Sequence, residues 1–274
     1  MPTATELRQT AYTAFIDSNI EQKMSLSSVL TASDAINTIA KIQLKSNQNQ
    51  PGLPEKPQLL NPLNVDRRSA HTPAGHAALM HAICHIEFNA VNLALDAIWR
   101  FEGMPAQYYR DWARVAKEEA YHFTLLQNHL KSISYDLEPY QYGSFPAHTG
   151  LWNMCEKTKD DIVARMALVP RTLEARGLDA TPLIQAKLGK VKTPYAIEAI
   201  AILDIILRDE IGHVAVGNYW YRWLCQRDNL DPMSHYVTLH NRHAAPKLRA
   251  PFNLEARLKA GFTSEEIQFL SALV

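Results

Sequence analysis

The sequence predicts an all-α protein, a bundle of four long helices with helical extensions at its N- and C-terminal ends. Apolar residues recur at helical period over long stretches, and no stretch alternates at period two beside turn signals. Glycine is sparse, with 10 among 274 residues, and prolines cluster between the apolar segments. An apolar share of 47% is enough for a sizeable core.

Residues 1–71 are expected to form an N-terminal helix and a proline-rich arm that pack on the bundle. Thr3 and Glu6 have capping-box spacing, which predicts a first helix reaching about residue 19. A second, weaker helix is expected over residues 26–44. The segment 47–73 carries five prolines, so we expect it to be extended, because proline lacks a backbone N–H and disfavours helix.

Residues 72–227 are expected to hold the bundle itself. Its four helices are expected over residues 74–101, 106–132, 151–176 and 194–225. A long loop is expected over residues 135–150, between the second and the third helix. Gly103 separates the first two helices. Pro170 should kink the third helix, Gly177 should end it, and a short piece over 181–188 should continue in roughly the same direction.

Residues 228–274 are expected to form a C-terminal helical extension. A short helix is expected near Ser234, after an Asp-Pro pair that ends the fourth long helix. Thr263 and Glu266 form a second capping box, which predicts a final helix.

Charge and cysteine content exclude several classes of protein. The chain has 28 basic and 28 acidic residues, so no net charge attracts nucleic acid or an anionic membrane. Its three cysteines are too few for a disulfide framework. The first residues are polar and no apolar signal segment follows them, so we expect a cytoplasmic protein with no membrane partner.

Two of the predicted helices carry the same pair of metal-binding side chains. Glu119 and His122 lie on the second helix, and Glu210 and His213 lie on the fourth. Residues three apart project from one helical face, one turn apart. Two such pairs, each preceded by another acid, indicate a two-metal bundle, which needs one more inward glutamate from each remaining helix.

Depth in the bundle identifies these two glutamates. On the first helical hairpin, Gly103 lies midway between Glu87 and Glu119 in the sequence. Antiparallel helices joined by a short loop place residues equally distant from the turn at equal depth, so we expect Glu87 to face Glu119. The neighbouring His81 and His85 are expected to be hydrogen-bonded interior histidines rather than a separate metal pair.

The same argument selects a ligand on the third helix. Lys192, in the turn before the fourth helix, lies midway between Glu174 and Glu210 in the sequence. Because the helix is interrupted on the way, Asp160 and Asp161 remain alternative ligands at this position.

The predicted metal ligands carry enough charge for two divalent cations. The set consists of Glu87, Glu119, His122, Glu174, Glu210 and His213. Four buried carboxylates would be costly without compensation, and two dications cancel their charge. Mixed carboxylate and imidazole donors suit iron or manganese, and zinc can also occupy such a site. Glu119 and Glu210 are expected to bridge the metals and to be the catalytic pair.

This layout resembles the ferritin-like di-iron carboxylate superfamily, and more closely an uncharacterised bacterial family of ferritin-like proteins. The closer resemblance covers roughly residues 51–262, and its motifs are Pro51–Pro54, His81–Glu87, Glu118–Phe123, Arg208–His213, Arg249–Asn253 and Gly261-Phe262. The resemblance implies a ferritin-like fold and a non-haem di-iron site. Two iron ions are therefore the expected cofactor, with Mn/Fe or zinc occupancy as alternatives.

The sequence thus predicts a non-haem di-iron oxidoreductase that activates dioxygen to oxidise or hydroxylate a substrate. The expected partners are dioxygen, an unknown small-molecule or tRNA-like substrate and an electron-donor protein, and the chain is expected to be a monomer or dimer. One alternative is a ferroxidase that handles iron without an organic substrate. A second is a redox-silent scaffold stabilised by metal.

Overall fold

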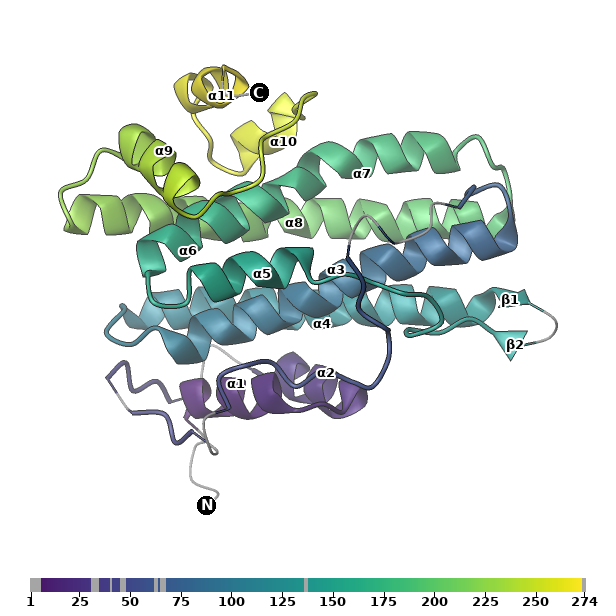
Figure 1. The fold of residues 1–274 in the computed structure, drawn as a ribbon, viewed down its shortest axis with the longest axis horizontal. Helices are drawn as coiled ribbons and strands as arrows, with labels where there is room; N and C mark the ends of the chain where they lie inside the picture. The colour runs from purple at the N-terminus through teal and green to yellow at the C-terminus, as the bar shows by residue number, and fades with distance from the viewer. Residues whose placement is uncertain are drawn as a thin grey trace. The chain divides into compact units, whose positions relative to one another are not determined.

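The protein is mostly helical, with almost no strand among the described residues, which confirms the predicted all-α class (Figure 1). The computed structural model describes residues 6–30, 35–39, 41–44, 48–61, 64, 68–135 and 138–272. Within this part of the chain, the one sheet is a pair of two-residue antiparallel strands, β1 (Ser134–Tyr135) and β2 (Glu138–Pro139).

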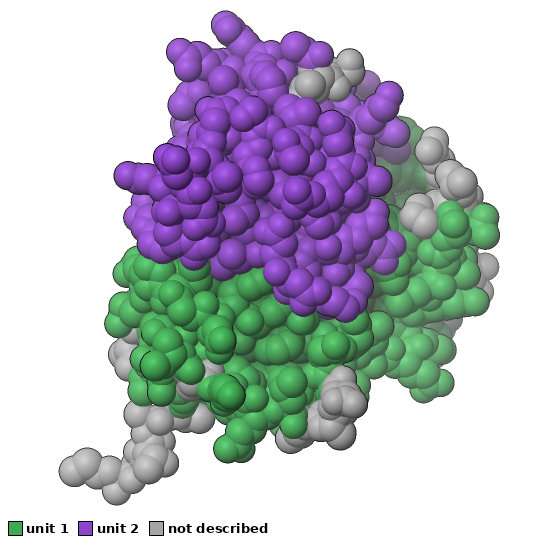
Figure 2. All heavy atoms as spheres, turned by 60° about the vertical axis from the view of Figure 1, so that its left-hand side comes forward, with its two compact units in different colours: residues 1–149, 193–202 green, residues 150–192, 203–274 purple. Residues whose placement is uncertain are grey.

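The chain divides into two compact units, coloured separately in Figure 2. Unit 1 comprises residues 1–149 and 193–202, and unit 2 comprises residues 150–192 and 203–274. The division falls within α8 (Pro194–Arg227), a continuous helix of 34 residues whose first turns belong to unit 1. The expected division into segments 1–71, 72–227 and 228–274 stays a prediction.

Two long helices, α3 (Pro73–Arg100) and α4 (Ala106–Ser132), form the centre of unit 1. Both lie within one residue of their predicted bounds. The Thr72 hydroxyl accepts a hydrogen bond from the Gly75 N–H at 3.1 Å and so caps the first turn of α3. Gly103 has a positive φ of 74° in the short turn between the helices, a conformation that glycine adopts without strain.

Two short helices, α1 (Leu7–Ile16) and α2 (Ile20–Ser28), pack on this pair, α1 against α3 and α2 against α4. Arg8 of α1 is buried, and its guanidinium donates to the Ile98 and Trp99 carbonyls at 3.4 and 3.0 Å. These carbonyls belong to the last turn of α3, where no helical N–H is available to them. The arginine therefore ties the N-terminal segment to the end of the long helix.

The prediction of a helix over residues 26–44 is wrong. Helix α2 ends at the third residue of that range, and none of its described residues from 35 onward is helical. The backbone there bonds to α1 instead, because the Leu7 N–H donates to the Ala35 carbonyl at 2.9 Å. Glu6 caps α1 with its side chain, whereas Thr3, its predicted partner, lies outside the described residues.

The prediction of one kinked third helix is also wrong. Unit 2 opens instead with four consecutive pieces: α5 (Gly150–Lys157), α6 (Ile162–Leu168), the π-helix η2 (Val169–Glu174) and α7 (Ala175–Leu188). Asp161 caps α6 and so marks a break that periodicity alone did not reveal. At Pro170 the helix has wide π turns rather than a simple kink, whereas Gly177 and Pro182 both lie inside α7 without ending it.

The C-terminal extension contains α9 (Pro232–Arg242), α10 (Leu254–Lys259) and α11 (Ser264–Ser271). The short helix predicted near Ser234 is α9. The capping box of Thr263 and Glu266 is confirmed in both directions at the start of α11. Helix α10 was not predicted, because six residues are too few to show a helical period.

Helix α3 is the one helix in the described part of the chain that is long and apolar enough to cross a membrane. Its most apolar window has a mean hydropathy of 1.2, and 78% of that window is buried inside the protein. A buried core helix of a soluble protein passes the same test, so a single helix of this kind is weak evidence for a membrane span.

Candidate metal centre

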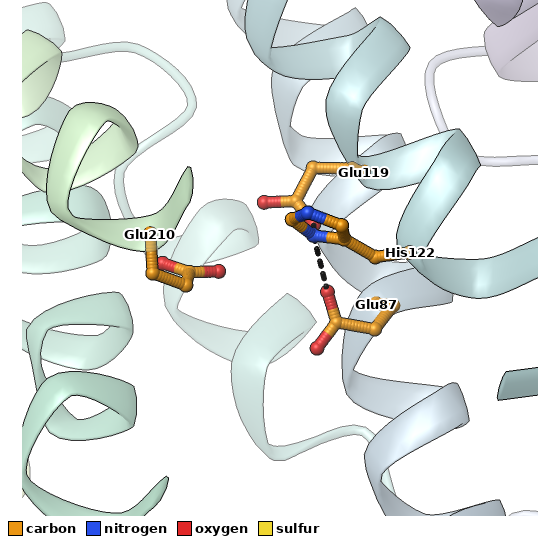
Figure 3. Close-up of side chains that lie close together, drawn as sticks. All are labelled: Glu87, Glu119, His122 and Glu210. Atoms are coloured by element: carbon orange, nitrogen blue, oxygen red, sulfur yellow. Dashed lines mark hydrogen bonds and ion pairs between the residues drawn. The ribbon is translucent and has the colours of Figure 1, made fainter. Parts of the chain in front are cut away.

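Three buried side chains from α3 and α4 meet in the core of unit 1. His122 Nδ1 lies 3.4 Å from Glu87 Oε2 and 3.3 Å from Glu119 Oε2. Figure 3 shows the three side chains pointing toward one another, with a dashed line between His122 and Glu87. Each offers one ligand atom, and these atoms lie within 4.8 Å of one another. This buried Glu/His cluster can therefore hold a metal ion.

Regular helix geometry accounts for the position of each member of the cluster. Glu119 and His122 are three residues apart on α4 and share its inner face. Glu87 comes from α3 at the same distance from the Gly103 turn as Glu119, and the structure brings it to the same place. The three residues are therefore together as the sequence predicted, and their role as metal ligands stays a prediction.

The electrostatics of the cluster suit a cation. Burial raises the pKa of Glu87 well above its usual value, and the neighbouring Glu119 raises it further. Burial alone would lower the pKa of His122, but hydrogen bonds to Glu119 and Glu87 outweigh it and raise this pKa to about 11. The two acids thus favour a positive charge at this position, and a divalent cation can supply that charge while satisfying all three groups.

Unit 2 contains a second carboxylate–imidazole pair. Glu210 Oε1 lies 3.7 Å from His213 Nδ1, again one turn apart on a single helix, α8. His213 is fully buried and Glu210 is 9% exposed. Figure 3 draws Glu210 on its helix. The coordination of metal by these two residues stays a prediction.

Glu174, the third ligand predicted in unit 2, is the last residue of η2 and is 8% exposed. Among the described residues of 150–192 it is the least exposed acid. The two alternative ligands, Asp160 and Asp161, are placed differently. Asp160 is exposed to solvent, and Asp161 accepts the Ala164 N–H at 2.9 Å as the N-cap of α6. Burial therefore favours Glu174, and its coordination stays a prediction.

His81 and His85 are hydrogen-bonded interior histidines, as predicted. His81 Nε2 accepts the Gly143 N–H at 2.9 Å, and His85 Nδ1 lies 2.8 Å from the Tyr142 hydroxyl. Both rings also stack against Tyr142. These contacts attach the loop after β2 to α3.

Sequence reasoning missed a second polar group in unit 1. His76 Nε2 lies 3.0 Å from His129 Nε2, and His129 Nδ1 lies 3.2 Å from Glu198 Oε2 on the first turns of α8. The signal was present, because His129 follows His122 by two helical turns and therefore shares its helical face. This spacing of seven residues is longer than the spacing of three that identified the predicted metal ligands.

Comparison with known proteins identifies a family without a described activity. Residues 16–268 match the model of the family described as "Protein of unknown function (DUF455)". The chain is also 48% identical over 236 residues to a protein of Haemophilus influenzae that is described only as uncharacterized, covering 83% of this chain and 79% of that protein. No solved structure matches the chain.

Proposed function

The chain belongs to the DUF455 family, and we propose that it is a ferritin-like, non-haem di-iron oxidoreductase that activates dioxygen. The observation that carries this proposal is the buried cluster of Glu87, Glu119 and His122. Two acids and an imidazole in a core are costly unless a cation compensates them. In our proposal the carboxylate–imidazole pair of α8 and the buried Glu174 complete the set of six ligands.

The first turns of α8 support the inclusion of Glu210. Within unit 1, Glu198 lies 3.2 Å from His129 of α4. Glu210 follows Glu198 on the same helix by a rise of about 18 Å, and Glu119 precedes His129 by about 15 Å. If α8 is antiparallel to α4, as the proposal requires, Glu210 and Glu119 come within one helical turn in depth. Each also offers a buried ligand atom that can hold a metal.

We assign the ligands as follows. Glu119 with His122 of α4, Glu210 with His213 of α8, and the two further acids Glu87 and Glu174 would together hold the metal ions. Four carboxylates then balance two ferrous ions. When bound, the iron pair supplies the electrons that reduce dioxygen. The chain excludes water from the centre, because Glu119, His122 and His213 are fully buried.

As a metal ligand, His122 would have to be neutral, so metal binding would release any proton that it carries. The proposal further includes an electron-donor protein and a small-molecule or tRNA-like substrate. It places no membrane in the reaction and has the chain act in the cytoplasm as a monomer or dimer.

Anaerobic titration with Fe²⁺, followed by exposure to oxygen, tests the proposal. We expect two irons per chain and oxygen uptake that depends on them. Glu119→Gln and Glu210→Gln should each abolish two-metal occupancy, because each removes a proposed carboxylate ligand. Asp160→Ala is the matched control, since its side chain is exposed, and it should retain both irons.

Several outcomes would overturn this proposal. Two irons bound by Glu119→Gln as tightly as by the natural chain would exclude the cluster as the site. Iron that is bound but takes up no oxygen would favour the redox-silent scaffold. Oxygen uptake by a large multimeric shell, measured by light scattering, would favour iron handling.

A further inference from the structure

A buried arginine lies beside the predicted ligand of η2. Arg171 precedes Glu174 by three residues in this π-helix and is 4% exposed. Its Nη2 lies 2.8 Å from Glu266 Oε1 of α11, and its Nη1 donates to the Asn218 side-chain oxygen of α8. Both partners are distant in sequence, so η2 is held by segments that fold onto it from later in the chain.

Aromatic rings enclose the same guanidinium. Its central carbon lies 4.7 Å from the centroid of the Phe262 ring, 5.3 Å from Tyr221 and 5.9 Å from Tyr236. Phe262 directly precedes Thr263, the N-cap of α11, and Tyr236 belongs to α9. The C-terminal extension therefore supplies most of the surroundings of Arg171.

Glu266 is itself fixed in position and charged. It accepts the Thr263 N–H at 2.8 Å, and Arg222 of α8 lies 3.5 Å away. Burial works to raise the pKa of Glu266, but Arg171, the Thr263 N–H and Arg222 outweigh it and keep this pKa below its usual value. The capping box of α11 thus fixes the position of the Glu266 carboxylate that faces Arg171.

Two further contacts restrain the segment around η2. At Gly217 of α8 an added Cβ would lie 2.5 Å from Pro170 Cβ, so the helix backbone touches the start of η2. Beyond η2, Arg257 of α10 forms an ion pair with Asp179 of α7 at 2.6 Å. The π-helix is therefore bounded by contacts at its start, its middle and the turn that follows it.

These contacts matter because a π-helix is rarely stable by itself. Such segments are uncommon and are usually maintained by their surroundings. If η2 changed from π-helical to α-helical hydrogen bonding, Glu174 would rotate about the helix axis relative to α6. This follows because a π-helix and an α-helix have different numbers of residues per turn. Whatever fixes the pairing of η2 therefore also fixes the direction of the Glu174 carboxylate.

We propose that α11 is a latch for the metal centre: the Glu266–Arg171 ion pair holds η2 in its π-helical form and so positions Glu174 for coordination. This inference rests on the proposed function. Arg171 and Glu266 are positioning residues in it, since neither is assigned as a ligand. The surrounding aromatic rings and Asn218 keep the arginine aligned along the segment.

A double-mutant cycle read out by Fe²⁺ affinity tests the link to Glu174. Glu266→Gln keeps the size of the side chain and can still form the capping box, but it removes the anion. By anaerobic calorimetry on the full chain, we expect one of the two irons to bind roughly tenfold or more weakly. In the Glu174→Gln background the same change should have less than a twofold effect. An equal loss in both backgrounds, or no loss in the first, would overturn the proposal.

Hydrogen exchange on the metal-free chain tests the latch without iron. Exchange of amides within Val169–Glu174 should speed up at least tenfold in Glu266→Gln. The exposed Glu265→Gln, one residue away in the same helical turn, is the control and should exchange as the natural chain does. Glu266→Asp keeps the charge, so it should restore most of the protection, and it serves as the test if Glu266→Gln does not fold.

The results of the two experiments distinguish a failure of the proposed function from a failure of the latch. A natural chain that binds no iron contradicts the proposed function and, with it, the positioning of a ligand. Unchanged exchange of η2 in a Glu266→Gln chain that binds two irons contradicts the latch alone.

Discussion

The α3–α4 pair of unit 1 and the α5–α7 segment of unit 2 each hold one of the predicted glutamate ligands, but they hold it by different means. Glu87 lies on a regular helix, and its position follows from its distance to the nearby Gly103 turn. Glu174 lies on a π-helix whose arginine is fixed by partners 47 and 95 residues away in the sequence. One ligand is positioned by local geometry and the other by late, distant contacts.

This difference separates a preformed half of the proposed site from an adjustable one. In unit 1 the carboxylates and the imidazole already lie at hydrogen-bonding distance, within helices that are buried on most sides. In unit 2, a change of helical pairing in η2 is enough to redirect Glu174.

The largest expected effect compares the two glutamates directly. Glu87→Gln should weaken Fe²⁺ binding roughly 100-fold or more, because it removes one acid from a fixed, buried cluster and leaves the cation undercompensated. Glu174→Gln should weaken it only about tenfold, since Glu174 is 8% exposed against 3% for Glu87, so solvent can better compensate for the lost acid. Anaerobic calorimetry measures both. Equal losses would mean that the two halves do not differ in the way proposed.

Acid should destabilise unit 1 through its buried histidines. Burial is the main cause that lowers the pKa of His76 and of His81 to about 4, against roughly 6.5 in an unfolded chain. Between these values the unfolded chain binds the extra protons, so stability falls as the pH drops from 6.5 toward 4. From pH 6.5 to 5 the loss should be on the order of 2 kcal/mol for each histidine.

Urea unfolding at pH 6.5 and 5 measures this effect. His76→Gln should remove about half of the loss of stability contributed by the pair. His71→Gln is the control, because that histidine is exposed on the same unit. An unchanged pH dependence in His76→Gln would show that this ring does not stay neutral in the folded protein.

Alanine substitutions at two glycines should change stability by a smaller amount and in opposite directions, because one glycine is closely packed and the other faces open space. Gly217→Ala should cost about 1–3 kcal/mol, because the new Cβ would meet both Pro170 carbons and lie 3.3 Å from the Arg171 backbone nitrogen. Gly177→Ala has nothing within 4 Å of the new Cβ inside α7, so it should stabilise the protein by about 0.5–1 kcal/mol. Thermal unfolding compares them. A Gly217→Ala chain as stable as the natural one would mean that η2 is not tightly held against α8.

The sequence predicted unit 1 far better than unit 2, for the same physical reason. Helices α3 and α4 have long apolar faces, a capping residue and a glycine turn, all of which are local signals, so Glu87 could be matched to Glu119 by counting residues. The break before α6 and the π turns of η2 have no local period. The contacts of Arg171 in η2 are with Glu266 and Asn218, which no pattern near Pro170 could indicate.

Two errors within unit 1 have a similar origin. Residues 26–44 were expected to be helical, but the backbone carbonyl of Ala35 accepts a hydrogen bond from Leu7 of α1 instead. The His76–His129 contact joins residues 53 apart, and only the spacing of His129 from His122 hinted at it. Local patterns identify helices, whereas pairs between helices have to be inferred from register.

A further small effect distinguishes a capping aspartate from a ligand. Asp161 accepts the Ala164 N–H at 2.9 Å, so Asp161→Ala should cost about 1 kcal/mol of stability, as the loss of Thr72 should at the start of α3. Neither change should alter the number of irons bound, because neither removes a proposed ligand. Chemical unfolding and metal analysis on the same samples measure both quantities. If Asp161→Ala lost one iron while Glu174→Gln still bound two, the unit 2 ligand would be Asp161 and not Glu174. The contrast between a preformed and an adjustable half of the site would then no longer hold.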